Sequence, residues 1–196
     1  MRNKGALRRS THINRYPAVN IHHARRYASA KGEPFNWMVT INFGFSGVAS
    51  ERASATLQKL LAQRLAPWLR RSAGNDNDIK PTYVWSLEAP HGVVSAHLLI
   101  HLPLPLSRGF GDRLLKWMEG LVGDIVPRRA IDVRPIRSLV GATRYLLKGI
   151  RDAWAPHLEV DPVLQGEIVG KRSGFSRNLG PTARKRAGYK PKRHFF

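Results

Sequence analysis

The chain contains no cysteine, which excludes disulfide bonds and thiolate metal sites and fits a reducing, cytoplasmic location. It also lacks any apolar run near the roughly 20 residues that a membrane-spanning helix needs. The amino terminus is basic, but no 7–15-residue apolar segment of the secretory type follows it. The sequence therefore predicts neither a membrane span nor a secretory signal.

Acidic residues are missing from both ends of the chain. Residues 1–31 hold 8 Lys or Arg and no acid, and residues 170–196 hold 9 and no acid. The middle, 32–169, has a net charge of only +3, although the whole chain has +20. Cationic ends favour a polyanionic partner, because each neutralised phosphate releases a counterion. Nucleic acid is favoured over a membrane surface, since Trp, Phe and Leu are sparse in these ends and Gly and Pro interrupt them.

A length of 196 residues with 42% hydrophobic content is enough for one domain with a proper core. Composition divides the chain into a basic, mostly flexible arm at 1–32, an α+β domain at 33–152, and an extension with a basic tail at 153–196.

Periodicity in the middle part predicts alternating strands and helices. The expected strands are 35–43, 83–88, 93–102 and 131–136, and the expected helices are 50–67, 110–122 and 139–150. A tight turn at Ala89-Pro-His-Gly92 makes the second and third strands a hairpin. Pro135 indicates an edge strand or a strand end.

This β-α-β-β-α-β-α order begins with the split, ferredoxin-like βαβ arrangement. That arrangement gives an antiparallel sheet with two helices packed on one face. The last helix lies outside the repeat, so it is expected to bring its side chains across the open face of the sheet.

Tyr145 and Lys148 occupy that last helix, and residues three apart lie on the same helical face. A phenolate is a nucleophile, while a nearby cation favours the phenolate and holds a phosphate beside it. These are the parts needed to cut a nucleic-acid strand and stay covalently attached to it.

Alternation along the third strand places Ser95, His97, Leu99 and His101 on one face, and Glu88 could lie across the hairpin from this row. An imidazole beside a carboxylate suits Mg²⁺ or Mn²⁺, which would polarise a scissile phosphate. Two histidines four apart on a strand are about 13 Å apart and cannot share one ion. A metal site would use one of them, and His97 is the expected ligand, with His101 structural.

The strand order, the segment from Gly92 to Pro103 and the helical Tyr145-Leu-Leu-Lys148 together resemble the HUH endonucleases over roughly residues 35–150. Among these the chain is similar to rolling-circle replication initiators of plasmids and filamentous phages. The resemblance implies that Tyr145 attacks DNA to form a 5′-phosphotyrosine link and a free 3′-hydroxyl. Lysine three residues after the tyrosine recurs in one-tyrosine members of the family.

One position departs from the family pattern. Two histidines of the family bind the metal, and the first of them falls on Ser95, which is a poor divalent ligand. This change is expected to weaken metal binding. His91, in the turn, is either a substitute ligand or a surface histidine.

Basic residues in the arms and beside the tyrosine are the expected nucleic-acid contacts. The segment 170–181 adds glycines, hydroxyls and one aromatic, which supply amides, phosphate contacts and a stacking platform. The expected contacts are Arg25, Arg26, Arg144, Lys171, Arg172, Arg177, Arg184, Lys185 and Arg186.

Together these features predict an initiator that nicks single-stranded or hairpin DNA of a mobile element. The chain has no helicase motif, so unwinding would need a host helicase. The alternative is a catalytically degenerate regulator or RNA-binding protein on the same scaffold, favoured by Ser95. A small ribosome-associated basic protein would explain the arms but not the Tyr145–Lys148 helix.

Overall fold

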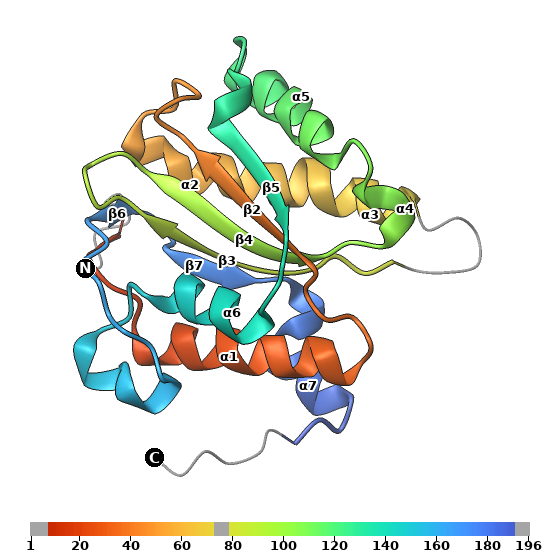
Figure 1. Ribbon diagram of the computed structural model, residues 1–196, viewed down its shortest axis with the longest axis vertical. Helices are drawn as coiled ribbons and strands as arrows, with labels where there is room; N and C mark the ends of the chain where they lie inside the picture. The colour runs from red at the N-terminus through yellow and green to blue at the C-terminus, as the bar shows by residue number, and fades with distance from the viewer. Residues whose placement is uncertain (1–7, 73–78, 191–196) are drawn as a thin grey trace, which may run out of the picture.

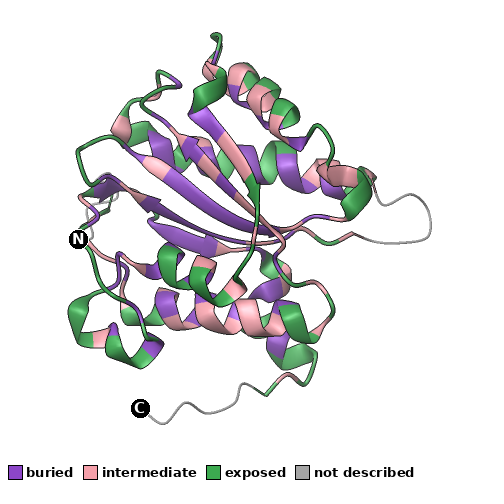
Figure 2. Ribbon diagram, in the orientation of Figure 1, coloured by how far each residue is buried: buried purple, intermediate pink, exposed green. Residues whose placement is uncertain are grey.

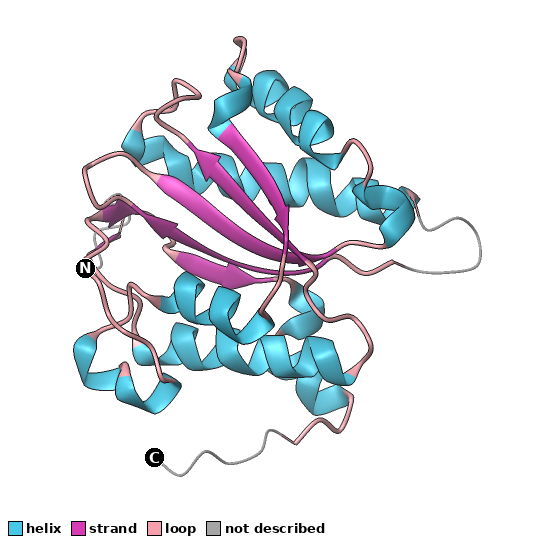
Figure 3. Cartoon of the chain, in the orientation of Figure 1, coloured by secondary structure: helices cyan, strands magenta, loops and turns pink. Residues whose placement is uncertain are grey.

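A five-stranded antiparallel sheet forms the centre of the protein (Figures 1 and 3). The structure, a computed structural model, describes residues 8–72 and 79–190. The predicted loop at 73–78 and the extremities of both basic segments lie outside the described residues. The sheet order is β5-β2-β4-β3-β7. The strands are β2 (Trp37–Asn42), β3 (Thr82–Glu88), β4 (Ser95–His101), β5 (Ile131–Pro135) and β7 (Ser173–Phe175).

The pairing of β3 with β4 confirms the predicted hairpin, with Glu88 opposite Ser95 and Thr82 opposite His101. Gly92 turns the chain between them with a φ of 77°, a backbone conformation that glycine adopts at little cost. β5 pairs only with β2, so it lies at a sheet edge, as Pro135 at its end indicates.

One face of the sheet is covered by a long helical run and a second helix (Figure 1). The run consists of α2 (Ser50–Lys59), a π-helical segment η1 (Leu60–Leu65) and α3 (Ala66–Arg71); the second helix is α5 (Phe110–Val122). The leucines predicted from helical spacing (Leu57, Leu60, Leu61 and Leu65) are all buried against the sheet. A short helix α4 (Leu104–Ser107) and a 3₁₀ turn η2 (Arg128–Ala130) flank α5.

The opposite face of the sheet is also covered, by α1 (Arg15–Ala30) and α6 (Leu139–Leu147), with α7 (Pro181–Arg186) beside them (Figure 1). A second core lies under these helices, so the strands are buried on both sides (Figure 2). The sequence predicted that the Tyr145 helix crosses the otherwise open face. In the structure α6 contacts β3 and β4 on this face and α1 lies there as well, so helices cover both faces.

Residues 15–30 form α1 rather than the irregular arm that the sequence predicted. Ala18, Ile21, Ala24 and Ala28 recur at helical spacing and are completely buried. Three of these four residues are alanines, whose periodicity is weak because alanine is only slightly apolar. The polar histidines and arginines between them further weaken the apolar periodicity from which a helix would be predicted.

The carboxyl-terminal extension is part of the fold as well. After the 3₁₀ turns η3 (Asp152–Trp154) and η4 (Pro156–Leu158), β6 (Ile168–Val169) pairs with β1 (Arg9–Ser10). β7 then joins the main sheet beside β3, and a 3₁₀ turn η5 (Arg177–Leu179) leads into α7. Only glycine fits at 174, because a Cβ there would lie 2.9 Å from the Trp85 indole. Among the described residues, no helix is both long and apolar enough to cross a membrane.

Candidate active site

Four side chains predicted from the sequence meet on the sheet face that α6 covers. Glu88 ends β3, His97 lies in the middle of β4, Tyr145 belongs to the last turn of α6, and Lys148 is its C-cap. Glu88 Oε1 lies 2.8 Å from His97 Nε2, and Glu88 Oε2 lies 2.8 Å from Lys148 Nζ. Lys148 Nζ also lies 3.9 Å from the centroid of the Tyr145 ring.

The register of the hairpin explains the contact between Glu88 and His97. Glu88 pairs with Ser95 and Ser86 pairs with His97, so Glu88 and His97 are diagonal neighbours on one face. This placement confirms the prediction that Glu88 lies beside the histidine row.

Two hydrogen bonds position α6 over the sheet. The Ser138 hydroxyl caps the helix by accepting a hydrogen bond from the Gly141 N–H at 3.1 Å. Ser86 on β3 donates to the Leu146 carbonyl at 2.9 Å and so ties the end of the helix to the sheet. Tyr145 directly precedes Leu146 in the chain and remains 41% exposed. The phenol is therefore both anchored and accessible from solvent.

His97 is the buried member of the group, with 4% of its surface exposed. Its Nδ1 lies 3.1 Å from Thr40 Oγ1 on β2, and its ring meets Tyr145 edge-on at 4.9 Å between centroids. Nε2 lies close to Glu88 but out of line for a hydrogen bond, so this buried nitrogen has no well-oriented partner among the described residues. Thr40 was not predicted as a site residue, although alternation along the 35–43 strand was a signal that could have placed it on this face.

The charges in the site stabilise one another. Burial would raise the pKa of the Glu88 carboxyl, but contacts with His97 and Lys148 outweigh burial and lower it. Burial would likewise lower the pKa of Lys148, but contacts with Glu88 and Tyr145 outweigh it and raise that pKa. At neutral pH the site therefore holds a carboxylate and an ammonium, and Lys148 acts as a cation rather than as a base.

The donor atoms of Glu88 and His97 are suited to a hard divalent cation. A buried imidazole nitrogen without an aligned partner, 2.8 Å from a carboxylate oxygen, is the arrangement expected of two ligands that share an ion. Within residues 8–72 and 79–190 no group of three or more His, Cys, Asp or Glu side chains gathers to hold a metal. His91 lies exposed in the β3–β4 turn, and His101 Nδ1 lies 2.8 Å from the Pro34 carbonyl, a structural contact as predicted. Mg²⁺ commonly keeps several waters and few protein ligands, so two ligands fit it.

The expected nucleic-acid contacts fall into three groups. Arg25, Arg26 and Arg144 line a pocket of about 380 Å³ between α1 and α6. Arg144 also forms an ion pair with Glu159 at the same pocket. These three side chains are therefore grouped at one pocket beside α6, the helix that carries Tyr145.

Arg172 and Arg184 are buried instead of facing a partner, which differs from the prediction. Arg172 donates to the carbonyls of Ser10, Gly166 and Gln165. Burial lowers its pKa to about 10, although Glu88 opposes this. Arg184 donates to the side chain and carbonyl of Asn20 on α1. Both arginines link distant backbone segments, and their side chains are not available to a nucleic acid.

The third group is exposed at the surface. Lys171, Arg177, Lys185 and Arg186 are all exposed, and Lys171 Nζ lies 5.6 Å from the centroid of the buried Trp85 ring.

Comparisons with known proteins give no family assignment. No family model matches the chain, and a search of curated proteins finds no match.

Proposed function

We propose that this protein is a nuclease that nicks single-stranded DNA through Tyr145 and initiates rolling-circle replication of a mobile element. The observation that carries the proposal is the meeting of an accessible phenol with a buried imidazole, a carboxylate and an ammonium on one sheet face. The first six main elements, β2-α2-β3-β4-α5-β5, with strand order β5-β2-β4-β3, support a ferredoxin-like split arrangement. In this proposal β7 is an added edge strand and α6 is the tyrosine-bearing helix outside the repeat.

In the proposed reaction, Tyr145 Oη attacks the phosphorus of a phosphodiester. The bond from phosphorus to the 3′ oxygen breaks, and a 5′-phosphotyrosine bond forms. The phenolic proton leaves to solvent, and the departing oxygen takes up a proton to become the free 3′-hydroxyl. Attack of that hydroxyl on the phosphotyrosine reverses the step and releases the enzyme.

The remaining side chains orient the phosphate and stabilise its charge. Lys148, held by Glu88 beside the phenol, places a positive charge where a phosphate would approach Tyr145. His97 Nε2 and the Glu88 carboxylate would hold Mg²⁺ or Mn²⁺, which supplies polarisation of the scissile phosphate when bound. Thr40 orients the imidazole through Nδ1.

The nucleic-acid partner is single-stranded or hairpin DNA. The pocket lined by Arg25, Arg26 and Arg144 lies beside α6, where it would receive the strand next to the scissile phosphate. A host helicase would supply unwinding.

Covalent capture tests the proposal. Labelled single-stranded and hairpin oligonucleotides are incubated with the full chain and Mn²⁺, then resolved on a denaturing gel. Tyr145→Phe keeps the ring against His97 but removes the nucleophilic oxygen, so adduct should fall by more than about 10³-fold. Tyr16→Phe, at an exposed tyrosine on α1, is the matched control and should leave adduct formation unchanged.

Ser95 favours a second candidate, a catalytically degenerate nucleic-acid-binding protein. It sits directly opposite Glu88 in the ladder, where an imidazole would add a third ligand. Such a protein would bind oligonucleotides equally well in chelator and would form no adduct with any of them. That outcome would reject the nuclease.

A further inference from the structure

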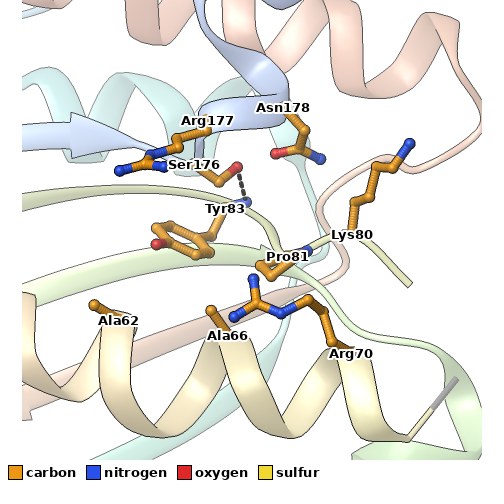
Figure 4. Close-up of a pocket in the computed structure, with 9 residues that line it drawn as sticks. All are labelled: Ala62, Ala66, Arg70, Lys80, Pro81, Tyr83, Ser176, Arg177 and Asn178. Carbon is orange, nitrogen blue, oxygen red and sulfur yellow. Dashed lines mark hydrogen bonds between the residues drawn. The ribbon is translucent and has the colours of Figure 1, made fainter. Parts of the chain in front are cut away.

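A basic pocket of about 510 Å³ lies beside Tyr83, on the sheet face that the α2–η1–α3 run covers (Figure 4). α3, the start of β3 and the η5 turn surround it, so it brings together three segments that are far apart in the sequence. Its charged lining residues are Arg70, Lys80 and Arg177, and no acidic side chain lines it.

Two arginines approach one phenol in this pocket. Arg70, from α3, and Arg177, from η5, both interact electrostatically with Tyr83. Among the described residues, neither guanidinium forms an ion pair with an acidic side chain. Two cations facing one cavity repel each other, and an anion between them would reverse the sign of that interaction. The pocket is therefore suited to a phosphate.

The other lining groups are suited to a flat, hydrogen-bonding ring. Tyr83 is only partly buried and its ring faces the pocket, while Ala62 and Ala66 on the opposite helix are too small to fill the space (Figure 4). Asn178 Nδ2 donates to Thr82 Oγ1 at 2.8 Å, and its Oδ1 is a buried acceptor without a partner among the described residues. An amino group on a stacked ring would satisfy that oxygen.

We propose that this pocket binds one nucleotide of a single-stranded nucleic acid. The phosphate lies between Arg70 and Arg177, the base stacks on Tyr83, and Asn178 Oδ1 accepts from the exocyclic amino group of the base. The inference rests on the proposed function only in taking nucleic acid as the partner.

The pocket is a second binding site, separate from the point of cleavage. Tyr83 and Glu88 lie at opposite ends of β3 and on opposite faces, about 16 Å apart along the strand. The sheet edge between the two faces is the short strand β7, which pairs only with β3. A single-stranded nucleic acid that passes over this edge would place the bound nucleotide several nucleotides from the scissile phosphate.

Binding of fluorescein-labelled single strands of about 12 nucleotides tests the pocket. The full chain carries Tyr145→Phe in every sample, so that no cleavage occurs, and equal thermal midpoints confirm that each variant is folded. Arg70→Gln/Arg177→Gln should weaken binding at least about 10-fold and, because one phosphate contact is lost, reduce the slope of log K against log salt by about 0.7. Lys59→Gln/Arg71→Gln removes two exposed charges from the same helical run outside the pocket lining and should weaken binding much less.

Base identity gives a sharper test. Asn178→Ala should weaken binding of oligodeoxycytidine, which carries exocyclic amino groups, and leave oligothymidine unchanged, because thymine has none. The inference would be overturned if Asn178→Ala weakened binding of both oligonucleotides equally. It would also be overturned if Lys59→Gln/Arg71→Gln lost as much affinity as Arg70→Gln/Arg177→Gln. Displacement of the strand by free deoxycytidine monophosphate at equal concentration would also overturn it in favour of a mononucleotide pocket.

The test separates this inference from the nuclease itself. If the wild-type chain forms the adduct but the pocket variants bind single strands unchanged, the pocket inference is rejected and the nuclease proposal stands. Pocket effects without any adduct leave the inference standing and reject nicking through Tyr145.

Discussion

At the scale of single residues, Glu88 organises the candidate active site. Its carboxylate contacts the His97 imidazole with one oxygen and the Lys148 ammonium with the other. Its side chain is only 13% exposed, so these contacts operate with little solvent screening. A single neutralising change at Glu88 would therefore disturb both partners.

Glu88→Gln should lower the free energy of unfolding by about 1–3 kcal/mol at pH 7, since the Lys148 ammonium loses its charged partner. The folded pKa of Glu88 lies below its ordinary value, so its stabilising contribution is present above the unfolded pKa and is lost as pH falls through the folded pKa. The stability difference between the wild type and Glu88→Gln should therefore shrink below about pH 4.5. Urea unfolding of both proteins at a series of pH values measures this stability difference.

The exposed Asp161 provides the control for this experiment. Asp161→Asn should leave stability within about 0.5 kcal/mol at every pH. A Glu88→Gln difference that is the same at pH 3 and pH 7 would show that the carboxylate charge does not stabilise the fold.

Residue spacing indicated pairs of these side chains, but not that all four meet. Helical spacing puts Tyr145 and Lys148 on one face, and alternation along the two strands of the predicted hairpin allowed Glu88 to lie across from His97. Spacing could not separate Arg172 and Arg184 from the exposed cations, because a guanidinium looks the same in sequence whether water or backbone carbonyls surround it. Only the packing of β1, α1 and the 165–172 segment decides that.

At the scale of elements, residues 15–30 form the helix α1 and not the flexible arm predicted from the sequence. Its buried face packs against the second core, which also contains Val84 of β3 and Leu99 of β4. It thereby packs on the same sheet face as α6 and contacts that helix. The basic residues Arg25 and Arg26 are consequently presented from a fixed helix.

Ile21→Ala tests whether α1 is an integral element. Ile21 is fully buried, so truncation should cost about 2–5 kcal/mol of unfolding free energy. Tyr16→Ala, on the same helix but 71% exposed, should cost less than about 0.5 kcal/mol. Urea denaturation followed by circular dichroism measures both, and equal small effects would favour a loosely attached arm.

The remaining elements were predicted to different degrees. Strands β2 to β5, the α2–η1–α3 run and helix α5 carry strong apolar periodicity, and the structure has them close to the predicted ranges. β7 is only three residues long and contains Gly174, so its own sequence gave no strand signal. Its place beside β3 depends on the close fit of Gly174 against Trp85.

At the scale of the whole molecule, the basic ends wrap back onto a nearly neutral centre. β1 pairs with β6, and α7 attaches to α1 through Arg184 and Asn20. The charge of the ends is therefore held against the domain, not projected on two free arms, throughout the described part of the chain.

Lys185→Gln/Arg186→Gln tests whether the carboxyl-terminal charge contacts nucleic acid. Both residues are exposed on α7. If each contacts a phosphate, the slope of log K against log salt for a single-stranded oligonucleotide should fall by about 1.4. The matched pair Lys59→Gln/Lys116→Gln, exposed in the nearly neutral middle, should change the slope much less. Equal changes would mean that net charge alone governs binding.

The sequence by itself determined the mixed α+β class, the hairpin, and the common helical face of Tyr145 and Lys148, because these follow from local periods of two or 3.6 residues and a local turn signal. The tertiary structure alone decided which cations are buried, that α1 closes the second face of the sheet, and that Arg70 and Arg177 share a pocket with Tyr83. Those features depend on contacts between different elements of the fold, and no local pattern records which backbone a side chain will meet.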